Sequence, residues 1–313
     1  MRLRSCGALL EQTDDEIRAA VRRMLDACDV YDPPTPLDRL LDYRGLTTEE
    51  REALDTNRFL PRAIRRALHR IRGRVRGILD LQARHVYVDA TLHPHRRTFL
   101  YHHEVAHDVL EWHNALFVIT PEWALQPDVR RVFEAEANRF AALSLFQVDD
   151  LARWQRGRRL EAKDLAALAA RYGTSLNATA RHYVAEQDLP AALVVGSPER
   201  TSAGRQQIRL CYGVANGAYL RQFGDRLFDA VFPPTSAPAA VVNPGGAPIV
   251  EEEFDLTDLR RERQRMVAET IYNGYDTFTL VHVREPVRRR FGWLPSLGRS
   301  APAAQSLGSG RAT

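Results

Sequence analysis

The chain has 313 residues, a hydrophobic fraction of 44% and a formal net charge of +4. This length suits two or three domains of roughly 150 residues, and the composition supports a buried core. No apolar run approaches the about 20 residues that a membrane-spanning helix needs. We therefore expect no membrane partner, and with no recognisable export signal we expect a cytoplasmic location.

The predicted elements of the first half are mostly helical. From the spacing of apolar residues we expect helices over 14–30, 37–43, 48–55 and 61–71. Two short strands over 77–81 and 85–89 follow, where the period of the apolar residues is no longer helical. The remaining helices are predicted over 95–113 and 127–147, with a pair over 161–186 around a turn at 172–175.

After residue 190 the composition shifts towards short strands and turns. We expect strands over 191–195, 207–212, 239–242 and 277–283, and helices over 216–223 and 256–272. The overall class is therefore α+β. The predicted domains are a mainly helical core with a short β-hairpin over 1–150, a helix-turn-helix-like pair over 151–190, an α+β accessory or sensor domain over 191–294, and a disordered tail over 295–313.

The basic balance supports nucleic-acid binding only weakly. Lys163 is the only lysine, and a bias towards arginine is more typical of a GC-rich coding sequence than of a phosphate-binding surface. The cysteines Cys6, Cys28 and Cys211 are scattered, which suits a reducing compartment and shows no metal-type spacing. Charge and cysteines alone thus assign no function.

The pattern His-Glu-x-x-His, formed by His103, Glu104 and His107, lies within the predicted helix over 95–113. Histidines four residues apart share one helix face, about 6 Å apart along the axis, so both imidazoles can reach one ion. Glu104 can act as general base towards an attacking water. Zinc suits the site because it accepts imidazole and carboxylate ligands and keeps one position open.

Glu136 is the predicted third metal ligand. It shares an apolar stripe with Phe133, Phe140 and Leu143, and a cation would offset the cost of burying its charge. The plainer alternative is that Glu136 pairs with Arg139 on a half-exposed helix.

Two other residues compete for that third position. Glu134 lies on a shallower stripe of alanines. His113 has the metzincin spacing, but Leu110 stands where that spacing needs a glycine. In a continuous helix His113 would point roughly 120° away from His107, and we reject it as a ligand. Among the neighbours we expect His102 to be a packed histidine, and Asp108 and Asn138 are candidates to orient the imidazoles.

These residues resemble the ImmA/IrrE metallo-endopeptidases. The resemblance rests on RRTFLYHHEVAHDVLEW and on FEAEANRFAALSLF, and it extends over about residues 14–190. It implies a zincin-like peptidase domain with one zinc ion on His103, His107 and Glu136, and with Glu104 as the catalytic glutamate. The departures are Ala106, where the family often has glycine, and Leu145-Phe146-Gln147, where Leu-Met-Pro is common.

The resemblance also implies a role. It indicates a regulatory endopeptidase of a stress response that cleaves a specific protein, such as a helix-turn-helix repressor. The strand pair over 77–89 offers a candidate edge for an extended substrate.

The alternative is a DNA-binding transcriptional regulator with an inactive or structural metal site. The segment 164–184 has the shape of a helix-turn-helix, and Ser175 is a good N-cap for its second helix. Its candidate contact residues, which include Asn177, Thr179, Arg181 and His182, form a mixed surface. We favour a packing role for this pair, with nucleic acid as the less favoured partner.

Overall fold

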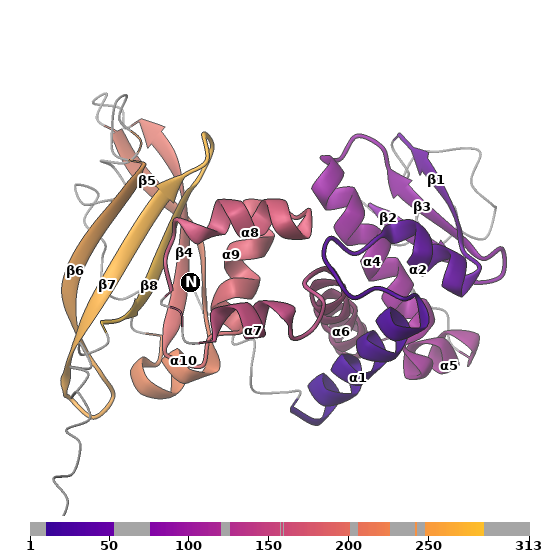
Figure 1. Ribbon diagram of the computed structural model, residues 1–313, viewed down its shortest axis with the longest axis horizontal. Helices are drawn as coiled ribbons and strands as arrows, with labels where there is room; N and C mark the ends of the chain where they lie inside the picture. Colours follow the sequence, from indigo (N-terminus) through magenta and orange to yellow (C-terminus); the bar gives the residue numbers. More distant parts are fainter. Residues whose placement is uncertain are drawn as a thin grey trace, which may run out of the picture.

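The computed structural model describes residues 11–52, 76–119, 126–156, 158, 160–200, 206–225, 242 and 248–284. The predicted α+β class is confirmed in these ranges, which contain helices, a small mixed sheet and a larger antiparallel sheet (Figure 1). Within them, every helix is too short or too polar to cross a membrane. The predictions for 61–71, 239–242 and 295–313 lie wholly or almost wholly outside the described residues.

The N-terminal part combines two helices with a three-stranded sheet. Helix α1 (Glu11–Ala27) and helix α2 (Leu37–Arg44) confirm the predictions over 14–30 and 37–43. The strands are β1 (Thr47–Arg51), β2 (Gly77–Asp80) and β3 (His85–Asp89), in the order β1-β3-β2. Strand β3 is central, pairing with β1 in parallel and with β2 antiparallel. The candidate edge for a substrate is therefore β2.

The helix predicted over 48–55 is wrong. Residues 47–51 form β1, in which Thr47 pairs with His85 and Thr48 with Val86. This segment is polar and has no apolar stripe, so its local preference is weak, and pairing with the central strand decides its conformation. The hairpin predicted over 77–89 is thus two strands of a three-stranded sheet.

The long helix predicted over 95–113 is two helices in the structure. Helix α4 (Pro94–Val109) ends at Leu110, which has extended backbone angles of φ −73° and ψ 105°. Helix α5 (Glu111–Ile119) begins directly after it. Helix α6 (Pro127–Leu145) confirms the prediction over 127–147 and packs against α4. The break at Leu110 redirects every residue that follows it.

A group of short helices connects the two sheets. Helix α7 (Asp150–Gln155) was not predicted, while α8 (Asp164–Tyr172) and α9 (Leu176–Ala185) confirm the helical pair. Gly173 ends α8 with φ 61°, a left-handed conformation that glycine adopts without strain. The Ser175 hydroxyl caps α9 by accepting a hydrogen bond from the Ala178 N–H. Figure 1 shows α7 to α9 between the large sheet and the N-terminal part.

The larger sheet has five antiparallel strands in the order β5-β4-β8-β7-β6. The strands are β4 (Ala191–Arg200), β5 (Gln206–Ala215), β6 (Ile249–Thr257), β7 (Arg263–Tyr272) and β8 (Thr277–Val283). Helix α10 (Gly217–Phe223) confirms the prediction over 216–223, and its Tyr219 and Phe223 belong to the same buried cluster as Ala192 and Val281 of the sheet.

The helix predicted over 256–272 is wrong, because these residues belong to β6, β7 and the turn between them. The Asp258 carboxylate accepts hydrogen bonds from the N–H groups of Arg260 and Glu262, which closes the turn. Both faces of β7 are buried at its centre, from Met266 to Thr270. A strand buried on both faces has a nearly continuous apolar run, which sequence spacing does not distinguish from a helix.

Helix α6 contributes to two separate cores. Its residues Ala137, Phe140 and Leu143 pack with α1, α4 and the small sheet. Leu145, with Phe146 directly after the helix, packs instead with α8, α9 and the large sheet. One helix is therefore shared by the two halves of the molecule.

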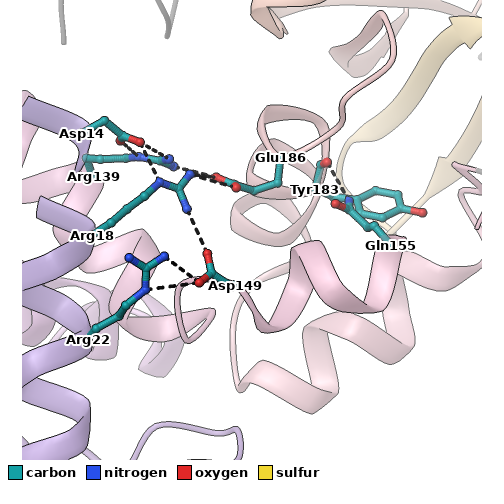
Figure 2. A network of polar contacts seen from close by, with 8 residues as sticks. All are labelled: Asp14, Arg18, Arg22, Arg139, Asp149, Gln155, Tyr183 and Glu186. Atoms are coloured by element: carbon teal, nitrogen blue, oxygen red, sulfur yellow. Dashed lines mark hydrogen bonds and ion pairs between the residues drawn. The ribbon is translucent and has the colours of Figure 1, made fainter. Parts of the chain in front are cut away.

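A cluster of ion pairs also joins these halves (Figure 2). Arg18 of α1 and Arg139 of α6 both bind Asp14 and Glu186, the residue that follows α9. Figure 2 also shows Arg22 bonded to Asp149. Because Glu186 is largely buried and bonded to two arginines, this cluster fixes α9 against α1 and α6.

Candidate metal centre

Helix α4 carries the His-Glu-x-x-His motif into the interior. The helix starts with His93 as N-cap and Pro94 at its first position. Eight consecutive residues, from Tyr101 to Asp108, are buried. Such a run cannot come from an amphipathic surface helix, so α4 is covered on all sides at the motif.

Three side chains converge at the motif in a way that could hold a metal ion. They are His103, His107 and Glu134, whose ligand atoms all lie within 4.8 Å of one another. The Nε2 atoms of the two histidines are 3.3 Å apart, and Glu134 Oε2 lies 3.5 Å from His103 Nε2. Two imidazoles and one carboxylate are a donor set that binds divalent transition metals, with zinc among them.

The pKa values of the two histidines shift in opposite directions. Burial and the neighbouring His103 and His113 lower the pKa of His107 to about 3. Burial also disfavours the charged form of His103, but the hydrogen bond to Glu134 and the charges of Glu104 and Glu134 raise its pKa above the ordinary value. Burial likewise opposes ionisation of Glu134, but the hydrogen bond and charge of His103 and the charge of Arg130 lower its pKa. A neutral His107 is the form that can ligate a metal.

Glu104 is buried next to these histidines and beneath strand β2. It is 8% exposed. A Cβ atom placed on Gly77 would lie 2.5 Å from Glu104 Oε1, closer than any real contact. Glycine at position 77 therefore gives the Glu104 carboxylate its space, directly under the edge strand of the small sheet. Sequence reasoning missed Gly77, since only the fold brings it to Glu104.

Glu136, the predicted third ligand, is buried as expected but has other partners. Its Oε2 accepts hydrogen bonds from Trp112 Nε1 at 2.9 Å and His113 Nε2 at 2.7 Å. The argument that a buried carboxylate needs compensation holds, and these two donors supply it. The carboxylate grouped with His103 and His107 is that of Glu134, which is half-buried.

His113 lies in the same region, which contradicts the expectation that it points away. That expectation assumed one continuous helix, and the break at Leu110 removes the assumption. The ring of His113 is fully buried, its Nδ1 is 3.0 Å from Nδ1 of His107, and it stacks on Phe133 at 4.2 Å. Leu110 occupies the position where the metzincin spacing needs glycine, but its extended backbone alone turns the chain.

Three other polar residues near the motif have assigned partners. His102 is a packed histidine, as expected, and its Nδ1 is 2.8 Å from Ser144 Oγ. Asp108, a candidate to orient an imidazole, instead forms ion pairs with Arg44 and Arg84. Asn138 contributes a hydrogen bond that raises the pKa of His103.

Comparison with known proteins gives a fold and no family. No model of a protein family matches the sequence, and no curated protein matches it. A solved structure described as a Mycobacterium tuberculosis transcriptional regulator is similar at a TM-score of 0.52 and 15% identity. The match covers 86% of this chain and 76% of that one. At this identity the similarity concerns the fold alone.

Proposed function

We propose that the chain is a zinc-dependent endopeptidase with a regulatory role, holding the ion on His103, His107 and Glu134. The observation that carries the proposal is the convergence of three ligand atoms within 4.8 Å beside a buried glutamate in the second position of the motif. The donor chemistry fits zinc, and three protein ligands leave a fourth position open, as hydrolytic zinc sites require. Here Glu134 takes the place that sequence reasoning gave to Glu136.

The roles of the chain's own residues follow from their positions. A bound zinc ion would supply Lewis acidity and a more acidic water. Glu104 would take a proton from the attacking water and deliver it to the leaving amine. Burial excludes bulk water around Glu104, which strengthens its interaction with a developing positive charge. Strand β2 would present its backbone to an extended peptide next to Glu104.

Metal analysis and cleavage test the proposal together. Purified wild-type protein should hold one zinc ion per chain, and the His103→Ala variant should hold much less. Wild type should cut a helix-turn-helix repressor encoded beside it at one discrete site, with cleavage absent in Glu104→Gln. A wild-type protein that binds no divalent metal, or a Glu104→Gln variant that cuts as fast as wild type, would overturn it.

A second candidate is a transcriptional regulator that binds DNA. It is favoured by the similarity to the Mycobacterium tuberculosis transcriptional regulator. The helical pair offers mixed support, because Thr179, Ala180, Tyr183 and Val184 of α9 are buried and only part of that helix, including Arg181, faces solvent.

Duplex binding measured across salt concentrations tests this second candidate. Contacts to phosphates make the logarithm of the binding constant fall linearly with the logarithm of the salt concentration. Arg181→Ala should make this slope shallower by about 1, the contribution of one phosphate contact. Glu104→Gln should leave duplex binding unchanged, because the two candidates use different surfaces. The regulator proposal fails if duplex binding is absent or independent of salt.

A further inference from the structure

The side chains of Glu136 and His113 lie behind the metal-centre residue His107. His113 is fully buried, Glu136 is 4% exposed and His107 is 5% exposed. Two hydrogen bonds link the three side chains one after the other. Glu136 Oε2 lies 2.7 Å from His113 Nε2, and His113 Nδ1 lies 3.0 Å from His107 Nδ1. The remaining ring nitrogen of His107, Nε2, faces His103 and Glu134.

The direction of these hydrogen bonds follows from the chemistry of each group. The indole N–H of Trp112 can only donate, so Oε2 of Glu136 is an acceptor. The contact at 2.7 Å then requires the proton on His113 Nε2. When His113 is neutral and carries that proton, its Nδ1 has a lone pair, which accepts from Nδ1–H of His107. The lone pair of His107 consequently resides on Nε2, the atom within the metal group.

We propose that Glu136 and His113 are positioning residues that hold His107 in the tautomer whose unprotonated Nε2 can ligate the metal. This inference rests on the proposed metal centre and deepens it. Carboxylates behind metal-binding histidines commonly fix ring orientation and tautomer in this manner. Here the carboxylate acts through a second imidazole.

The reverse tautomers would prevent ligation. If His107 carried its proton on Nε2, that N–H would point at Nε2 of His103, 3.3 Å away, and no lone pair would face the site. The two ligands also differ in support. Among the residues described here, Nδ1 of His103 has no hydrogen-bond partner. Because Asn138 also hydrogen-bonds to His103, the difference between the two ligands lies at Nδ1, which is held from behind in His107.

Two substitutions of His113 separate positioning from packing. His113→Phe keeps a ring that can stack on Phe133 but removes the acceptor for His107. His113→Asn loses the ring but keeps an acceptor oxygen near the position of Nδ1. We expect the Kd for zinc ion, measured by competition with a chelator, to rise about 10- to 100-fold in His113→Phe and by less in His113→Asn. A role in packing alone predicts the opposite order.

Ring-nitrogen NMR gives a readout that needs neither zinc nor cleavage. In the metal-free protein at pH 8, the ¹⁵N shifts of His107 should show a protonated Nδ1 and an unprotonated Nε2. His113→Phe should lose this single tautomer, and Glu136→Gln should weaken it because an amide can also donate to His113. Ser144→Ala is the matched control, since it removes a buried partner of His102 and leaves His107 untouched.

Different results would overturn the positioning role and the metal centre. A wild-type His107 protonated on Nε2, or a zinc Kd unchanged in both His113 variants, overturns the positioning role. A wild-type protein with the expected tautomer and no affinity for zinc overturns the metal centre instead. Loss of zinc affinity in Ser144→Ala as large as in His113→Phe would show a general effect of core disruption and would also overturn the positioning role.

Discussion

The interior of α4 and the interior of strand β8 are equally inaccessible but differ in what they bury. Between His102 and Asp108, α4 buries five ionisable side chains: His102, His103, Glu104, His107 and Asp108. Strand β8 buries Phe278, Leu280 and Val281 with two threonines, and its one buried ionisable residue is His282. Burying a charge is costly unless it has a partner, so a fold that needs only stability uses apolar residues. The concentration of ionisable groups in α4 therefore agrees with the metal centre proposed on this helix.

The largest effect is expected from Glu104→Gln. The amide has nearly the same size and cannot take up a proton, so cleavage should fall by about 10²- to 10⁴-fold. Zinc content should stay at the wild-type level, because Glu104 is not among the proposed ligands. Cleavage rate and metal content are measured on the same preparation. Glu16→Gln, an exposed substitution in α1, is the control and should change neither.

Leu280→Ala tests the other side of the comparison. Leu280 is fully buried in the core formed by the large sheet, α8 and α9. Removing its side chain should lower the free energy of unfolding by about 2–5 kcal/mol, as measured by urea denaturation. The folded variant should bind zinc like wild type, and Leu210→Ala, at an exposed position of the same sheet, should unfold like wild type. A large loss of zinc affinity in the folded Leu280→Ala variant would show that the two regions are not energetically separate.

Gly77→Ala tests whether the edge strand β2 sets the position of the Glu104 carboxylate. The added Cβ would meet Oε1 of Glu104 at 2.5 Å, so the carboxylate must move. The backbone at Gly77 is outside the left-handed region, so the substitution adds a contact without adding backbone strain. A displacement of about 1 Å in a catalytic group can cost about 10²-fold in rate. We expect a loss of that order in cleavage, with zinc affinity and Tm near wild type. Unchanged cleavage would show that the position of the carboxylate matters little.

The smallest effect concerns the ion-pair cluster that joins the halves. His182, Arg139 and Arg18 lower the pKa of Glu186 below its ordinary value of 4.5 despite its burial, and Arg139 and Arg18 lower that of Asp14 below 3.8 despite burial. Groups with depressed pKa values stabilise the folded state above their unfolded pKa, and this contribution disappears as the pH falls through their folded pKa. Glu186→Gln should cost about 1–3 kcal/mol at pH 7.

The pH dependence of unfolding tests the same cluster. Wild type should lose stability between about pH 5 and pH 3, and Glu186→Gln should show a shallower decline. Glu16→Gln again serves as the control, because its carboxylate is exposed. Parallel curves for wild type and Glu186→Gln would contradict the assignment.

Local spacing predicted the elements whose apolar faces are simple. Helix α1 and the pair α8 and α9 each have a stripe of apolar residues, and the strands β2 and β3 are short apolar runs with polar residues at their ends, so their type followed from the residues alone. The motif on α4 likewise placed His103 and His107 together, since four residues make about one helical turn.

The remaining errors arise where distant segments decide the structure. Strand β1 exists because β3 pairs with it, and β7 looks helical because both its faces are covered. The prediction of Glu136 as a metal ligand is untested, but its partners could not be foreseen, because the break at Leu110 brings Trp112 and His113 to it. No apolar stripe on α6 carries that information, since burial of a carboxylate does not specify its partner.

The sharing of α6 between two cores has a mechanical consequence. Glu134 and Phe146 are twelve residues apart, which in a helix is about 18 Å. Phe146 is packed against Tyr172 and His182, on the side of the large sheet. A closely packed helix transmits displacement along its axis and absorbs little of it. One helix thus links the core of the large sheet to the Glu134 carboxylate of the candidate metal centre, and we expect a displacement at one end to be transmitted to the other.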